Sequence, residues 1–170
     1  MSGKKPAYLV LDDGRIFEGF AWAKTGEAFG EAVFSTGMTG YQETLTDPSY
    51  HKQIVVMTAP HIGNTGINLE DNESSKIWVA GFVVRNPSSI TSNWRSTSDL
   101  EEELIKQGVV GISGVDTRAI TRHLRDRGAM RVGIFSETDL TREEMVIEVR
   151  KQNPMTGAYL CGDVSTEVPY

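Results

Sequence analysis

The sequence has little that would hold a metal ion, enter a membrane or bind a nucleic acid. It contains one cysteine and three histidines in 170 residues, which excludes an internal disulfide framework and a cysteine-rich zinc site. No apolar run approaches the ~18 residues that a membrane-spanning helix needs, and residues 1–6 show no signal peptide. Seventeen basic residues against 23 acidic ones argue against nucleic-acid binding. We therefore expect a cytoplasmic protein with neither a membrane nor a nucleic acid as its partner.

Familiar catalytic motifs are also missing. The sequence has no G-x-x-x-x-G-K-[ST] loop and no G-x-G-x-x-G between a strand and a helix. The glycines of residues 61–68 favour a tight turn with positive φ. Cys161 lies in a Leu-Cys-Gly triplet that resembles part of a nucleophile turn, but a cysteine nucleophile needs a base and an orienting group. The histidines all lie upstream, outside any carboxylate motif. We therefore expect a semi-buried thiol and no catalytic or metal-binding residue.

The residues that are present predict an α/β domain with two unlike halves. Strands are expected first, rich in Val, Ile and aromatic residues, and a hairpin turn is expected at residues 12–14. In the second half, Ser98, Asp116 and Thr141 are predicted to cap helices, and Gly108 and Gly128 are predicted to end the first two. This alternation favours a mixed sheet covered by helices. The expected strands span residues 7–11, 15–22, 31–34, 53–57, 77–84, 109–112 and 131–135.

One predicted helix carries a basic face in this acidic chain. Arg118, Arg122 and Arg125 fall at i, i+4 and i+7, which places three guanidinium groups on one side. Such a stripe can bind an anion or an acidic patch of another protein. One hypothesis is therefore a free-standing interaction module. The simpler interpretation is a solvated helix face.

Residues 34–50, with the sequence FSTGMTGYQETLTDPSY, form the most distinctive stretch. Thr39 and Gln42 match a capping box, and residues 41–45 supply about one helical turn. Asp47-Pro48 ends this turn, because proline disfavours helical geometry in the residue before it. The arrangement predicts a tight turn that holds Ser49 and Tyr50 near the surface.

This stretch closely resembles the N-terminal domain of the small, glutamine-hydrolysing subunit of carbamoyl phosphate synthetase. The resemblance continues through residues 60–64 (PHIGN), 77–84 and 114–128, and covers residues 7–164. It implies a three-layer β/β/α domain of the swivelling type with a mixed sheet, over residues 1–152. Residues 153–170 would then be a tail leading to the linker of an amidotransferase domain that these 170 residues lack.

The resemblance also implies a role. In the family, a C-terminal amidotransferase domain hydrolyses glutamine with a Cys-His-Glu triad, and the ammonia passes to the large subunit. The large subunit uses ATP and magnesium to form carbamoyl phosphate for arginine and pyrimidine synthesis. The N-terminal domain chiefly holds the glutaminase domain against the large subunit. We therefore expect a structural and docking domain that binds no cofactor itself and is inactive alone.

One binding residue carries over from the family motif. The serine of the Asp-Pro-Ser-Tyr motif reaches across the domain interface and helps to bind the substrate glutamine, and here this serine is Ser49. A hydroxyl can donate one hydrogen bond and accept two, which suits a charged amino-acid head group. The alternative is that Ser49 only satisfies its own turn.

Overall fold

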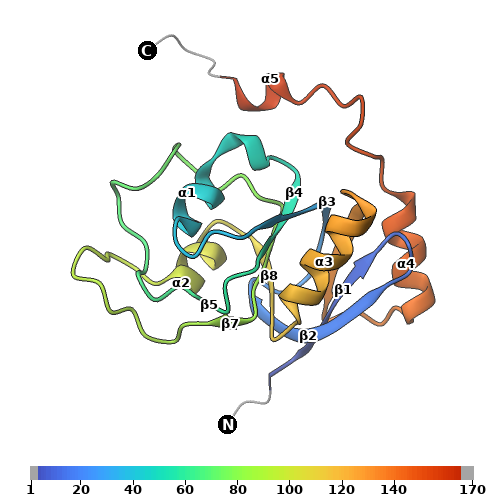
Figure 1. The fold of residues 1–170 in the computed structure, drawn as a ribbon, viewed down its shortest axis with the longest axis horizontal. Helices are drawn as coiled ribbons and strands as arrows, with labels where there is room; N and C mark the ends of the chain where they lie inside the picture. The colour runs from blue at the N-terminus through green and yellow to red at the C-terminus, as the bar shows by residue number, and fades with distance from the viewer. Residues whose placement is uncertain (1–3, 166–170) are drawn as a thin grey trace.

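The sheet closes into a barrel of seven strands in the order β1-β2-β8-β6-β4-β3-β9, in a computed structural model that describes residues 4–165 (Figure 1). Strands β3, β4, β6 and β8 pair in parallel, and the remaining pairs are antiparallel. The barrel strands are β1 (Pro6–Leu11), β2 (Ile16–Ala23), β3 (Glu27–Ser35), β4 (Gln53–Met57), β6 (Gly81–Val83), β8 (Val110–Ser113) and β9 (Arg131–Ser136).

Helices cover the barrel on several sides. In Figure 1, α1 and α2 lie on one side, α4 lies on the other, and α3 lies between them. A short parallel pair, β5 and β7, lies outside the barrel. These elements are α1 (Tyr41–Thr46), the 3-10 turn η1 (Pro48–Tyr50), α2 (Leu100–Lys106), α3 (Thr117–Arg127), α4 (Arg142–Lys151), α5 (Cys161–Val164), β5 (His61–Ile62) and β7 (Asn86–Pro87).

Strand β4 shows how the core is divided. Ile54 and Val56 belong to the cluster that fills the barrel, where Ile120 of α3 also packs. Val55 and Met57 point the other way, into a second cluster beneath α1 and α2. Both faces of this strand are therefore buried, which explains its continuous apolar sequence. A third, smaller cluster packs α4 against β1 and β9.

Most of the predicted helix signals are confirmed. The Asp116 side chain accepts from the Ala119 N–H at 3.0 Å, and Thr141 with Glu144 forms a complete capping box. Gly108 and Gly128 have φ of 78° and 91° after α2 and α3. The predicted Ser98 cap is wrong, because Asp99 accepts from the Glu102 N–H instead.

Two strand predictions need correction. Only Gly81–Val83 of the expected residues 77–84 joins the barrel, because Trp78 N–H instead donates to the Leu45 carbonyl at the end of α1. Strand β3 is longer than the predicted residues 31–34 and begins at Glu27, where it pairs with β9. The mixed α/β character, with strands first and helices later, is confirmed. The closure of the sheet was not predicted.

Strand β3 approaches Lys52, the residue just before β4, closely at Gly30. A Cβ atom at this position would lie 2.4 Å from the Lys52 carbonyl oxygen, far inside contact distance. Residue 30 therefore has no room for a side chain.

Candidate functional site

The Ser49 turn is built by its neighbours. Asp47 ends α1 and caps η1, with its Oδ1 accepting from the Ser49 N–H at 2.8 Å. Pro48 occupies the first position of η1, where its missing N–H costs nothing. Ser49 itself is exposed, and within residues 4–165 its hydroxyl makes no hydrogen bond. The turn is therefore complete without the Ser49 hydroxyl, which stays free for a ligand.

The described part of the tail returns to this turn. Asp163 of α5 lies 3.1 Å from Lys52 Nζ and 3.2 Å from His51 Nε2, both measured from its Oδ2. The hydrogen bond from Lys52, followed by that from His51, lowers the pKa of the Asp163 carboxyl below its ordinary value. His51 also packs edge-on against Trp78, with ring centroids 5.4 Å apart. The contacts place α5 against residues 51 and 52, just after the Ser49 turn, and Figure 1 shows α5 above α1.

Gln42 is not part of a capping box. Gly40 occupies the N-cap position of α1, and no side chain caps the helix. Gln42 is instead buried, and its Nε2 donates to the Asn68 carbonyl at 2.6 Å and to Asn72 Oδ1 at 2.7 Å. Its Oε1 accepts from the Asn68 N–H at 3.0 Å. Gln42 thus ties α1, just before the Ser49 turn, to a distant loop.

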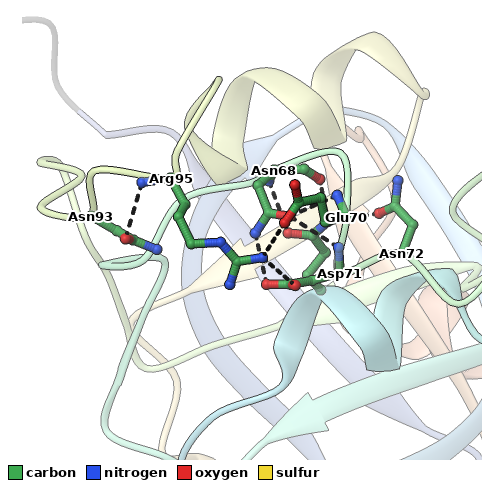
Figure 2. Close-up of polar contacts among 7 residues, drawn as sticks. Asn68, Glu70, Asp71, Asn72, Asn93 and Arg95 are labelled. Atoms are coloured by element: carbon green, nitrogen blue, oxygen red, sulfur yellow. Dashed lines mark hydrogen bonds and ion pairs between the residues drawn. The ribbon is translucent and has the colours of Figure 1, made fainter.

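That loop is held by a polar network that sequence reasoning missed (Figure 2). Arg95 donates to Glu70 Oε2 at 2.8 Å and to Asp71 Oδ1 at 2.9 Å. Asn68 Nδ2 donates to the other Asp71 oxygen at 2.7 Å. These bonds, first that from Asn68 and then that from Arg95, lower the pKa of the Asp71 carboxyl. The network joins residues 68–72 to residues 93–95.

The basic stripe of α3 is exposed, as predicted. Arg118, Arg122 and Arg125 all face solvent, and no ion pair involves them within the described chain. Arg125 lies over the Phe34 ring at 5.9 Å from its centroid. The opposite side of the helix buries Ile120 and Leu124. The stripe is therefore free to meet a partner.

Cys161 begins α5 and is exposed, so the expected semi-burial of its thiol is wrong. Among the residues that the structure describes, no histidine bonds to this thiol. His51 faces Asp163, and His123 contacts Asp13 Oδ2 at 2.7 Å. Within residues 4–165 the Cys161 thiol therefore has no histidine hydrogen-bonded to it that could act as its base.

The described part of the chain shows neither a metal-binding cluster nor a membrane-spanning helix. No group of three or more His, Cys, Asp or Glu side chains within residues 4–165 is placed to hold a metal ion. No helix in the same range is long and apolar enough to cross a membrane.

Comparison with known proteins gives one consistent family. Residues 9–134 match the family described as carbamoyl-phosphate synthase small chain, CPSase domain. The carbamoyl phosphate synthase small chain of Streptomyces coelicolor is 66% identical over 168 residues, which cover 98% of this chain and 44% of that protein. The corresponding chain of Mycobacterium tuberculosis is 61% identical over 167 residues, covering 96% and 44%. The chain thus spans less than half the length of these relatives.

Proposed function

Because this chain belongs to the carbamoyl-phosphate synthase small chain family, by the match of residues 9–134 to its CPSase domain, we propose that it is the N-terminal structural and docking domain of such a small chain. The whole small chain would supply ammonia from glutamine for ATP-dependent carbamoyl phosphate synthesis. The partners in this proposal are the large subunit and the chain's own amidotransferase domain. The match to the CPSase domain carries the proposal.

The division of labour follows from the same proposal. Glutamine hydrolysis belongs to a Cys-His-Glu domain outside these 170 residues, and the large subunit uses ATP and magnesium, in the cytoplasm. We also propose that the barrel walls correspond to the two β layers of a swivelling-type β/β/α domain, with the helices as its third layer.

The docking role is tested by mixing the chain with the large subunit. We expect a complex by size-exclusion chromatography and sedimentation velocity, and no release of ammonia from glutamine by the chain alone. Ammonia release at an enzyme-like rate by the chain alone would contradict the proposal, and so would the lack of a complex.

Within this function, Ser49 binds the substrate glutamine across the domain interface. Its exposed hydroxyl and the turn completed by Asp47 support this role. The hydroxyl would donate to the carboxylate, or accept from the ammonium, of the amino-acid head group. The locked backbone holds the hydroxyl in place, so that little entropy is lost when glutamine binds.

The test replaces Ser49 by alanine in an intact small chain assembled with the large subunit. A lost hydrogen bond to a charged group is worth ~1.5–3 kcal/mol, so KM for glutamine should rise roughly 10- to 150-fold, with a smaller effect on turnover. Synthesis from free ammonia should not change. Ser89, an exposed serine of another loop whose hydroxyl also makes no hydrogen bond within residues 4–165, gives the matched control Ser89→Ala. An unchanged KM for glutamine would remove Ser49 from the site.

A second candidate is a free-standing interaction module, favoured by the exposed and unpaired α3 stripe within the described chain. It would bind an acidic protein surface through Arg118, Arg122 and Arg125. A salt-sensitive complex with an acidic protein, and none with the large subunit, would favour the module over the docking domain.

A further inference from the structure

Two large apolar side chains project side by side from the loops joined by the polar network. Leu69 is 82% exposed and Trp94 is 92% exposed. They line one shallow hollow, which we call the Leu69–Trp94 surface, together with Asn68, Glu70, Arg95 and Thr97. A single exposed apolar side chain is ordinary, but neighbouring ones on a polar background mark an interaction site. Tryptophan is also among the residues that most often dominate binding energy at protein interfaces.

Both side chains are held on fixed backbone. Arg95, next to Trp94, bonds to Glu70, next to Leu69. The backbones of the two loops are also bonded, with the Ile67 N–H donating to the Ser98 carbonyl at 2.9 Å and the Thr97 N–H donating to the Ile67 carbonyl at 2.8 Å. Figure 2 shows the bonds of Arg95 to Glu70 and Asp71 that join the two loops. A surface fixed before binding loses little conformational entropy when a partner arrives.

A cavity of about 310 Å³ adjoins the same surface and shares Asn68, Leu69 and Thr97 with it. Its apolar lining includes Leu45, Ile67 and Ile77. The surface therefore offers two projecting apolar groups and one recess large enough for a partner's side chain. This alternation of projection and recess fits the packed centre of a protein interface.

The residues around the Leu69–Trp94 surface carry an excess of negative charge, which favours a partner with basic side chains. Carboxylates outnumber basic groups five to three around the surface and its adjoining hollows, with Glu43, Glu70, Asp71, Glu102 and Glu103 against Lys76, Arg95 and Lys106. A second copy of the chain would bring the same acidic excess against itself, which disfavours self-association. A complementary partner must offer an apolar side chain flanked by lysine or arginine.

We propose that the Leu69–Trp94 surface is where the chain binds the large subunit, which inserts an apolar side chain into the adjoining cavity and places basic side chains against Glu70 and Glu102. This inference rests on the proposed docking function and names the surface that performs it. The described part of the tail leaves this surface open, because α5 is fastened to Lys52 near the Ser49 turn.

The experiment compares variants of the chain by their Kd for the large subunit, measured by isothermal titration calorimetry. Leu69→Ser and Trp94→Ser should each weaken binding by about 30-fold, as hot-spot truncations do. Ile90→Ser is the matched control, because Ile90 is 74% exposed in the same loop segment but lies outside the hollows of this surface. The Kd of the Ile90→Ser variant for the large subunit should stay within about twofold of the Kd of the unchanged chain. Glu102→Lys should weaken binding most at low salt, where its charge is least screened.

Each outcome supports or overturns one statement. If the unchanged chain does not bind the large subunit, the proposed function fails. If the unchanged chain binds and Leu69→Ser and Trp94→Ser bind equally well, the function stands and this surface is wrong. Self-association abolished by Trp94→Ser would make a second copy the occupant and overturn the inference. So would burial of Trp94 in an intact small chain without the large subunit, read from the fluorescence that the Trp94→Phe variant loses. Circular dichroism shows that each variant is folded.

Discussion

Replacing Gln42 by alanine tests whether the link between α1 and the loop at Asn68 stabilises the domain. The Gln42 side chain is 5% exposed and makes three hydrogen bonds, two of them with the Asn68 backbone. The variant leaves the N–H and the carbonyl of Asn68 without their partner. Asn68 is itself buried, so these groups lose a bond that bulk water does not simply replace.

The expected loss follows from the fate of these two groups. An unpaired buried polar group costs ~1–3 kcal/mol, so two groups set a range of about 2–6 kcal/mol. Gln42 also lines the cavity beside α1, which lets water reach part of the vacated space. We therefore expect the lower end, a loss of about 2–3 kcal/mol in the free energy of unfolding. For a chain of this size this corresponds to a fall in Tm of roughly 5–10 °C.

Urea unfolding followed by circular dichroism measures this loss. Glu43→Ala is the control, because Glu43 is the next residue of α1 and its side chain makes no hydrogen bond in the described chain. It should change stability by less than about 0.5 kcal/mol. If Gln42→Ala were as mild as Glu43→Ala, the network would not stabilise the domain and the reasoning would be refuted.

Two further predictions concern β3 and the tail. Gly30→Ala should lower the free energy of unfolding by about 3 kcal/mol, because its Cβ would meet the Lys52 carbonyl. The control is Gly162→Ala, whose added Cβ would have a side-chain atom of Tyr159 at 3.5 Å as its nearest contact. In the same urea titration, Gly162→Ala should leave the free energy of unfolding nearly unchanged. The lowered pKa of Asp163 means that its contacts are formed above the ordinary pKa of 3.8 and are lost as pH falls below it. The fluorescence anisotropy of a dye attached to Cys161 should therefore fall in acid. The variant Asp163→Asn should lower this anisotropy already at pH 7. An anisotropy at pH 7 that Asp163→Asn leaves unchanged would contradict the contact between the tail and Lys52.

Local signals carried the successful predictions. The Asp116 cap, the Gly128 stop and the Thr141–Glu144 capping box each involve residues within a few positions of one another, so their geometry is encoded in a short stretch. Strand β4 was recognisable because both of its faces are buried and its sequence is apolar throughout. These elements need no knowledge of what lies opposite them.

The missed features all depend on residues far apart in sequence. Thr39 and Gln42 match a local cap, yet the Gln42 amide bonds to a loop 26 residues away. Arg95 pairs with Glu70, which lies 25 residues earlier in the chain, and no hydrophobic or charge periodicity in the sequence predicts a pair so far apart. Closure of the barrel depends on β9 pairing with both β1 and β3. The turn that exposes Ser49 was predicted locally, but the proposed glutamine-binding role of Ser49 rests on the family motif alone.

Closure by β9 also sets the order of events on the ribosome. β1 spans Pro6–Leu11, but its partner β9 spans Arg131–Ser136, so the ring cannot form until residue 136 has been synthesised. Until then β1 and β3 each have an unpaired edge, which is a template for pairing with other chains. At a synthesis rate of about 5–20 residues per second, the time between the synthesis of β3 and that of β9 is several seconds or more. The growing polypeptide is thus most vulnerable to misassembly before β9 emerges, when most of its apolar sequence already exists.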